Sequence, residues 1–336
     1  MNLITQNIKI AVIGSSYWGI NLVRNFNELG VLESVCDQSA SSLEKTKEIA
    51  PAVKTTSNYK DVLNDKNING VVIATPAITH HKLALEFLKA GKDVLVEKPL
   101  SLNIDDGYNL VKYSNANNRI LMVGHVLEYH PAIIKIQQII STGDIGDLHY
   151  VYSNRLNFGK VRKEENILWS FAPHDIAIML RIIGEMPVSV SATGAEYLTP
   201  SVPDVTLTNL SFKNKIKGHI HVSWLHPFKE HRLVVIGSKK MITFDDVTKN
   251  LSLYDQHVQI KNNSLTPISG NVSDISYQTK EPLKIECEAF VEAIKTRKKP
   301  LTDGESGLKV IQVLATAQNS VTKHGIPMKI EEPKIA

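Results

Sequence analysis

One lysine stands where the chain could present an amine to a bound ligand. Lys98 follows the run Asp-Val-Leu-Val at 93–96 and Glu97, and Pro99 then turns the chain. In an open α/β sheet, ligands bind in the crevice beyond the carboxyl ends of the strands. An amine placed there can reach a reacting hydroxyl or carbonyl oxygen. Lys98 is therefore the first catalytic candidate, and the alternative is a surface lysine before a turn.

A glycine-rich turn follows the first predicted strand. Gly14, Ser16 and Gly19 occupy the three positions where the dinucleotide-binding fingerprint carries glycine, so serine stands at the middle position. Because backbone approaches a pyrophosphate there, we expect the small serine to be tolerated with the pyrophosphate slightly displaced. Tyr17 and Trp18 complete the turn and are predicted to belong to the cofactor site.

Three further positions extend this candidate site for a dinucleotide. Asp37 ends the second predicted strand, where a carboxylate accepts hydrogen bonds from the adenosine ribose and repels a 2′-phosphate, which favours NAD over NADP. Its alternative role is a helix N-cap. Thr75 and Pro76 end another strand and are expected beside the nicotinamide ribose. His80, one turn into the next helix, is either a cofactor contact or a solvated helix residue.

The first part of the chain alternates short apolar runs with amphipathic segments, which predicts a doubly wound parallel sheet of the Rossmann type. The predicted strands are 8–13, 32–36, 71–74, 94–96 and 120–123, and the predicted helices are 18–29, 41–50, 78–90 and 104–116.

After residue 146 the pattern changes to strands, which predicts a second, mostly antiparallel sheet and an α/β fold of two domains. We place an NAD-binding domain at 1–125 and an α+β domain for substrate binding and oligomerisation at 126–336. The last helices, 282–296 and 305–323, are expected to pack back on the domains, and 261–273 reads as an exposed loop. The strands are expected at 149–157, 187–196, 206–212, 217–224, 233–236 and 241–244.

Composition excludes several classes of protein. The 336 residues are 43% hydrophobic, and the net charge of +4 is dispersed, so neither nucleic acid nor membrane is expected as a partner. Residues 1–6 lack the features of a signal peptide and no apolar run is long enough to span a bilayer, so we expect a cytoplasmic protein. Cys36 and Cys287 read as inert core thiols, and the twelve histidines show no metal-ligand spacing, so no metal is expected.

Five motifs in this order resemble the glucose-fructose oxidoreductase/inositol dehydrogenase (Gfo/Idh/MocA) family over nearly the whole chain. The motifs are 14–19, Asp37, Ala74-Thr75-Pro76, Glu97-Lys98-Pro99 and Gly124-His125. The resemblance implies that Lys98 contacts both the nicotinamide ribose and the reacting oxygen of the substrate. Glu97 is predicted to belong to the cofactor site together with Lys98.

The second signature of that family lies at the head of a helix in its C-terminal domain. Its Asp-x-x-x-His pattern corresponds here to Ser170 and His174, so the resemblance implies that His174 is the acid/base and that the usual aspartate is lost. An imidazole with a pKa near neutrality can take a hydroxyl proton unaided. Asp175 would tune the site or, as we favour, cap a helix at 176–183. The alternative for His174 is a buried histidine bonded to backbone.

Several polar residues are predicted to line a substrate pocket. Arg155 and Asn157 share one side of a predicted strand by the period of two. The paired guanidinium groups of Arg155 and Arg162 suit a phosphate, because planar donors grip its oxygens in a bidentate manner. Tyr129 lies beyond the last strand of the first sheet. The other predicted contacts are Trp169, Asp175 and Trp224.

These residues favour a nucleotide sugar as substrate. Within the family the chain looks most like the UDP-N-acetylglucosamine 3-dehydrogenases, which implies oxidation at C3 for later amination in lipid A or related glycans, and a homodimer or homotetramer. The alternatives are ketoreduction of a deoxysugar nucleotide, oxidation of a polyol such as inositol, and a catalytically silent regulator that senses NAD.

Overall fold

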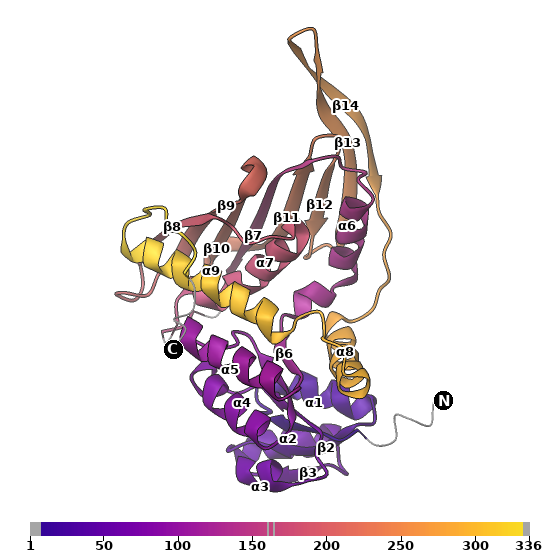
Figure 1. Ribbon diagram of the computed structural model, residues 1–336, viewed down its shortest axis with the longest axis vertical. Coiled ribbons are helices and arrows are strands. Elements are labelled where there is room, and N and C mark those ends of the chain that lie inside the picture. The colour runs from indigo at the N-terminus through magenta and orange to yellow at the C-terminus, as the bar shows by residue number, and fades with distance from the viewer. Residues whose placement is uncertain (1–7, 160, 164, 332–336) are drawn as a thin grey trace. The chain divides into compact units, whose positions relative to one another are not determined.

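The computed structural model describes residues 8–159, 161–163 and 165–331, and Figure 1 follows the chain through them. Residues 1–6, which were used to predict the absence of a signal peptide, lie outside the described residues. The chain forms two compact units. The first contains the described parts of Met1–Tyr129 and Lys280–Ile311, and the second contains His130–Thr279 and the described part of Gln312–Glu332.

The sheet of the first unit is parallel and has the strand order β3-β2-β1-β4-β5-β6. Three strands are buried along their whole length, which is why their sequences are continuous apolar runs rather than alternating ones. The predicted doubly wound sheet is confirmed, with β3 added. The strands are β1 Ile10–Ile13, β2 Leu32–Cys36, β3 Lys54–Thr56, β4 Gly70–Ile73, β5 Asp93–Glu97 and β6 Leu121–Gly124.

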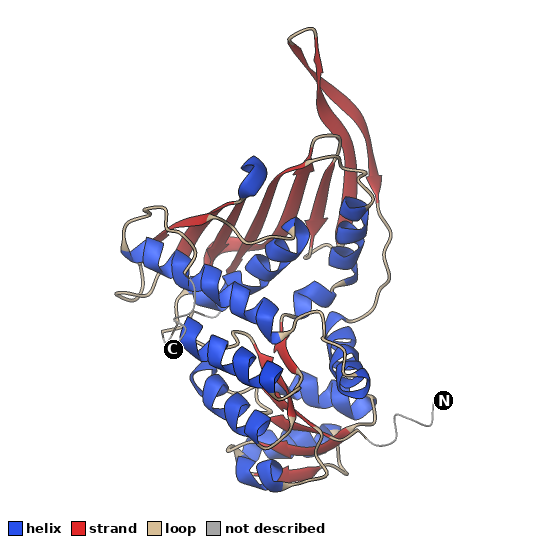
Figure 2. Cartoon of the chain, in the orientation of Figure 1, coloured by secondary structure: helices blue, strands red, loops and turns tan. Residues whose placement is uncertain are grey.

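Helices connect these strands, and three of them, α2, α3 and α5, begin at residues whose side chains cap free backbone N–H groups. Ser39 accepts from the backbone of Ser42 at the start of α2, and Asn103 accepts from Asp106 at the start of α5. Figure 2 shows these helices in blue. The helices are α1 Gly19–Glu28, α2 Ala40–Ile49, α3 Tyr59–Asn64, α4 His80–Lys89 preceded by the 3₁₀ turn η2 Ala77–Thr79, α5 Ile104–Ala116, and the 3₁₀ turn η3 Val126–Tyr129.

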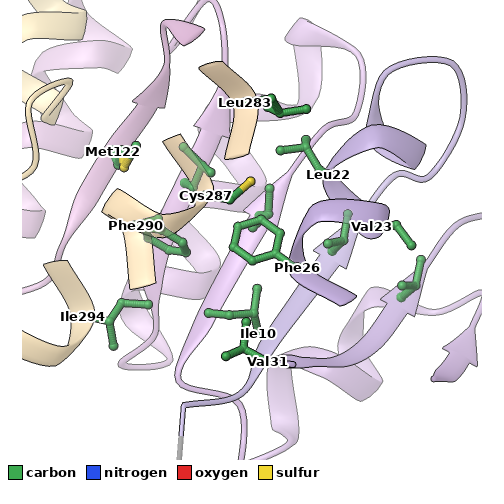
Figure 3. Close-up of a cluster of buried hydrophobic side chains, with 14 of the residues drawn as sticks. Ile10, Leu22, Val23, Phe26, Val31, Met122, Leu283, Cys287, Phe290 and Ile294 are labelled. Carbon is green, nitrogen blue, oxygen red and sulfur yellow. The ribbon is translucent and has the colours of Figure 1, made fainter. Parts of the chain in front are cut away.

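A late helix completes the core of the first unit. Helix α8, Pro282–Thr296, packs against α1, and the rings of Phe26 and Phe290 meet edge to face with centroids 6.4 Å apart. Such a pair contributes about 0.5–1.5 kcal/mol beyond the area it buries. Figure 3 shows this apolar cluster, with Cys287 inside it. The boundary between the two units falls within the next helix, α9, Gly304–Thr322.

The second unit is built on a sheet with the order β14-β13-β12-β11-β7-β10-β9-β8. Only the β7 and β10 pair is parallel, so the predicted mostly antiparallel sheet is confirmed. The strands are β7 Leu148–Phe158, β8 Ser189–Ala195, β9 Val205–Ser211, β10 Lys217–Ser223, β11 Leu225–Gly237, β12 Met241–Asp245, β13 Asn250–Lys261 and β14 Ser264–Asp274, with helices α6 Pro131–Ser141 and α7 Ile167–Ile183 and the 3₁₀ turn η4 Lys213–Lys215.

The prediction of a loop at 261–273 is wrong. This segment belongs to a hairpin of β13 and β14 whose tip is Asn262-Asn263. Both tip residues have positive φ, 50° and 64°, as a type I′ hairpin turn requires and as asparagine tolerates. The polar composition that suggested a loop reflects strands that are exposed along most of their length.

Candidate active site

A cleft lies at the carboxyl ends of β1, β2 and β4, where an open parallel sheet binds its ligands. Its volume is about 440 Å³. The residues of the predicted cofactor site that line it are Gly14, Ser16, Asp37, Thr75 and Pro76. The sequence interpretation missed others, because they follow the short polar strand β3 or lie along η2 and α4. These are Ser57, Tyr59, Thr79, Lys82 and Leu83.

The two outer glycines of the turn are required by backbone packing. Gly14 has φ +89°, and a Cβ built on it would lie 2.7 Å from the carbonyl oxygen of Ala74. A Cβ on Gly19 would lie 2.0 Å from the carbonyl oxygen of Gly14. Any side chain at Gly19 would therefore push the start of α1 away from β1, and the turn that is predicted to receive a pyrophosphate would be lost.

The carboxylate of Asp37 is held in place by the turn it faces. Its Oδ2 accepts from the backbone N–H of Ser15 at 2.7 Å, and its Oδ1 accepts from the backbone N–H of Ser39 at 2.8 Å. Oδ2 also accepts from the Ser15 hydroxyl at 3.4 Å, whereas Oδ1 keeps a second lone pair, and the residue lines the cleft. A fixed carboxylate in this position fits the two hydroxyls of an adenosine ribose. Ser39, not Asp37, caps α2.

Tyr17 and Trp18 do not line the cleft. The side chain of Tyr17 is 91% exposed. Trp18 is the N-cap residue of α1, and its indole Nε1 donates to Oε1 of Glu97 at 2.5 Å. The predicted direct contact of both aromatic residues with the cofactor stays a prediction.

Lys98 immediately follows β5 and is half-buried. The preceding residue, Glu97, is the register partner of Gly124 on β6, so the residues after them leave the sheet side by side. These residues are Lys98 and His125. The charge of Lys98 contributes to lowering the pKa of both His125 and His80, after the larger effect of their burial.

His80 holds backbone rather than lining the cleft, and the prediction of a cofactor contact is corrected here. Its ring is 1% exposed, with Nδ1 2.7 Å from the carbonyl oxygen of Pro99 and Nε2 2.9 Å from that of Thr75. Burial lowers the pKa of His80, which favours the neutral ring, and that ring donates to one of the two carbonyls at a time. His80 therefore joins the segment after Lys98 to the wall of the cleft.

His125 is a residue at this edge that the sequence interpretation named only within a motif. It is 1% exposed, and among the described residues neither ring nitrogen has a hydrogen-bond partner. Burial, with the charge of Lys98, lowers its pKa to about 3, so the ring is neutral at physiological pH. The sequence could have indicated His125 as a site residue, because it directly follows the buried strand β6.

In the second unit, His174 lies in α7, which begins at Ile167 and is capped by Asn166. The prediction that Asp175 caps a helix at 176–183 is therefore wrong. Asp175 is 1% exposed and lies inside the helix, where Arg155 donates to it at 2.8 and 3.1 Å and Ser153 at 2.5 Å. The polar side of β7 thus faces α7, and Arg155 and Asp175 stabilise the fold instead of contacting substrate.

Two further predicted substrate contacts are buried framework residues. Trp224 is 0% exposed and donates from Nε1 to Asp204 at 2.6 Å. Tyr129 is 4% exposed, and its hydroxyl pairs with Thr302 at 3.3 Å. Both aromatic side chains satisfy their polar atoms inside the protein, as buried tyrosine and tryptophan usually do. They are corrected here from substrate contacts to core residues.

Three predicted substrate contacts of the second unit remain partly accessible. Asn157 has a buried amide oxygen without a hydrogen-bond partner among the described residues. Arg162 pairs with Glu165 at 2.6 Å, yet its side chain is 38% exposed. Trp169 is half-buried. These side chains stay candidates for substrate binding.

The part of the chain that the structure describes contains no group of three or more histidine, cysteine or acidic side chains arranged to hold a metal ion. None of its described helices combines the length and the apolar character needed to cross a membrane.

Comparison with known proteins agrees with this geometry. Residues 8–125 match an oxidoreductase family with an NAD-binding Rossmann fold, and residues 133–243 match the GFO/IDH/MocA C-terminal domain. The fold and the cleft thus define an NAD-dependent oxidoreductase. The chain belongs to the Gfo/Idh/MocA family, and its cofactor is NAD.

Relatives of the chain act on several substrates. It is 23% identical to UDP-N-acetylglucosamine 3-dehydrogenase of Acidithiobacillus ferrooxidans, over 91% of this chain and 94% of that protein. It is 24% identical to myo-inositol 2-dehydrogenase of Thermotoga maritima, over 97% and 99%. The fold is shared with the solved structure of the Acidithiobacillus enzyme, with a TM-score of 0.84 at 21% identity over 94% and 98%. It is also shared with levoglucosan dehydrogenase in complex with NADH and levoglucosan, with a TM-score of 0.83 at 17% identity over 97% and 100%.

Proposed function

We propose that this protein is a dehydrogenase that oxidises a secondary hydroxyl of a sugar, with UDP-N-acetylglucosamine, oxidised at C3, as the first candidate substrate. The observation that carries the proposal is the position of Lys98. It follows β5 directly, at the edge of the sheet where the cofactor cleft opens. His80 fixes the backbone beside Lys98, because its ring contacts the carbonyl oxygen of Pro99.

The chain's own residues divide the chemistry between them. When bound, NAD would be held by cleft residues such as Gly14, Asp37 and Thr75 and would supply the acceptor for the hydride of the alcohol. Lys98 donates a hydrogen bond to the alcohol oxygen and stabilises negative charge as it develops there. His174 takes the hydroxyl proton on its imidazole and passes it to solvent. Atoms and charge balance, because the alcohol loses a hydride and a proton and becomes a ketone.

The choice of a nucleotide sugar rests on two supports. The first is the relative from Acidithiobacillus, which aligns along almost its whole length. The second is Arg162, a partly exposed guanidinium that suits a phosphate oxygen. Arg155 is less available to a phosphate than the sequence predicted, because its guanidinium group donates to both carboxylate oxygens of Asp175.

That occupied arginine favours a second candidate, a free polyol such as inositol. A neutral polyol needs hydrogen-bonding side chains but no pair of cations, and myo-inositol 2-dehydrogenase aligns with 97% of the chain. The deoxysugar ketoreductase has no observation in its favour. The silent regulator is favoured by Ser16 and Ser170, which replace usual family residues, but it does not require both Lys98 and His174. The homo-oligomeric assembly, the cytoplasmic location and the link to lipid A stay predictions.

The test is an assay of several candidate substrates, in which the absorbance of NADH measures turnover. Purified protein is incubated with NAD and with UDP-N-acetylglucosamine, other UDP-sugars, free N-acetylglucosamine or myo-inositol. Turnover of the nucleotide sugar with little turnover of the free sugar supports the first candidate. Turnover of myo-inositol alone supports the second. Absence of turnover across the panel, while NAD still binds, rejects the proposed dehydrogenase activity on these substrates.

Variants test the two catalytic assignments. Lys98→Met is expected to abolish turnover while NAD binding, measured directly, stays within a few-fold of the unsubstituted protein. His174→Ala is expected to lower the rate and to change its dependence on pH. Unchanged turnover in the first variant, or an unchanged pH profile in the second, removes that residue from its role.

A further inference from the structure

A hydrogen bond joins the glycine-rich turn to the strand end that carries the catalytic candidate. Trp18, at the end of the turn, donates from Nε1 to Oε1 of Glu97 at 2.5 Å. Glu97 immediately precedes Lys98, and its Oε2 accepts from the backbone N–H of Lys98 at 3.2 Å. One carboxyl group therefore contacts both segments with different oxygens.

The neighbouring strand leaves room for this carboxyl group. Gly124 is the register partner of Glu97, and a Cβ built on Gly124 would lie 2.9 Å from Oε2 and 3.1 Å from Oε1 of Glu97. Real Cβ atoms almost never approach so closely. The absence of a side chain at Gly124 thus creates the space in which Glu97 reaches Trp18.

The surroundings of the Glu97 carboxyl group raise its pKa. Burial raises the pKa of Glu97 to about 7, against the opposing effects of the Trp18 hydrogen bond and the Lys98 charge. The charge of Glu97 acts on two ionisable groups of α8, Glu286 and Cys287, and Glu128 of η3 also acts on Glu286. Burial, with the charges of Glu97 and Glu128, raises the pKa of Glu286 well above its usual range.

We propose that Glu97 is a positioning residue that ties Lys98 to the cofactor turn through Trp18, so that NAD binding at the turn fixes the catalytic lysine. The inference rests on the proposed function for the role of Lys98. An indole N–H donates more strongly to an ionised carboxylate than to a neutral acid, so the tie strengthens when Glu97 ionises.

The experiment is a double-mutant cycle on the holoenzyme with Trp18→Phe, Glu97→Leu and the double variant. Each single variant is expected to lower kcat roughly 10- to 100-fold, the effect of a catalytic group displaced by about 1 Å. The NAD dissociation constant is expected to stay within a few-fold. The double variant should be no slower than the slower single variant, because one interaction is removed in all three.

Glu97→Gln separates the hydrogen bond from the charge. The amide oxygen still accepts from Trp18, so this variant should retain much more activity than Glu97→Leu. The Trp18 fluorescence, obtained as the unsubstituted protein minus Trp18→Phe, should titrate near pH 7, whereas in Glu97→Gln it should not. This readout needs no turnover.

The control is Asn115→Ala, which removes an exposed hydrogen bond, 3.0 Å long, from an amide to the carboxylate of Glu305 elsewhere in the first unit. It should change neither kcat nor the fluorescence titration. The proposal is overturned if the reductions in kcat of the two single variants multiply in the double variant. It is also overturned if the emission of Trp18 does not titrate in the unsubstituted protein. If Lys98→Met retains turnover, the proposed function fails instead, and the titration still reports on Trp18 and Glu97.

Discussion

Arg155 and Asp175 form a buried two-pronged ion pair, with Nε to Oδ2 at 2.8 Å and Nη2 to Oδ1 at 3.1 Å. The aspartate is 1% exposed and lies within α7, which packs on β7. Parallel donors matched to both carboxylate oxygens satisfy the two charged groups inside the second unit. The pair therefore stabilises the helix on the sheet instead of presenting a cation to substrate.

Removing one partner of this pair should destabilise the protein. Asp175→Asn or Arg155→Met leaves an uncompensated buried charge or a polar group that has lost its partner. The free energy of unfolding should fall by about 3–5 kcal/mol. Urea denaturation measures this change. A loss below about 1 kcal/mol would show that the pair is not structural.

Arg162→Met is the control for Arg155→Met, because it removes an arginine whose ion pair is not buried. Its pair with Glu165 is at the surface, so stability should change by at most about 1 kcal/mol. If the substrate carries a phosphate, KM for it should rise while KM for NAD stays the same. Equal effects of Arg162→Met on charged and uncharged sugars would count against a phosphate contact.

Asp37 should control the choice between NAD and NADP. Asp37→Ser removes an acceptor that lines the cleft and the charge that repels a 2′-phosphate. The dissociation constant for NAD should rise roughly 10- to 100-fold, the loss expected for hydrogen bonds to a charged group, while that for NADP falls relative to it. Titration calorimetry with both cofactors measures the ratio. An unchanged ratio would exclude Asp37 from ribose recognition.

Gly19→Ala should abolish tight NAD binding, because its methyl group would meet the Gly14 carbonyl oxygen at 2.0 Å. Circular dichroism checks that the variant still folds. Ser16→Gly, which restores the usual glycine of the fingerprint, is the companion variant and should bind NAD as well as or better than the unsubstituted protein. Weaker binding by Ser16→Gly would mean that the serine hydroxyl contributes a bond of its own.

His125 should make the protein sensitive to acid. Its pKa in the folded state is about 3, below the ordinary value of 6.5, so the unfolded chain binds the proton more readily between these values. Stability is therefore lost as pH falls from 6.5 towards 3, by as much as about 5 kcal/mol from this residue. Unfolding measured across this range should show a shallower decline in His125→Leu.

His80→Leu is the control for that substitution, since both histidines are 1% exposed at the same sheet edge. His125 has no hydrogen-bond partner among the described residues, so His125→Leu should leave stability at pH 7 unchanged or higher. His80→Leu removes the contacts to Thr75 and Pro99 and should cost about 1–3 kcal/mol. Equal losses in the two variants would contradict this distinction.

Local sequence determined the parts of the site that lie on continuous chain. The order of apolar runs and helices predicts the parallel sheet, and in such a sheet every strand ends at the same edge. Gly14, Asp37, Thr75 and Lys98 could therefore be assigned to that edge from their places after predicted strands. The polar hairpin of β13 and β14 escaped prediction, because its strands lack the apolar alternation that identifies a half-buried strand.

Only the tertiary structure decided which polar side chains are available to a ligand. The alternation along β7 shows that Ser153 and Arg155 share a side, but not that α7 covers that side with Asp175. The same holds for His80 and Trp224, which contact Pro99 and Asp204, 19 and 20 residues away in the sequence. Periodicity specifies the direction of a side chain relative to its own backbone, whereas burial and pairing depend on which other element packs there.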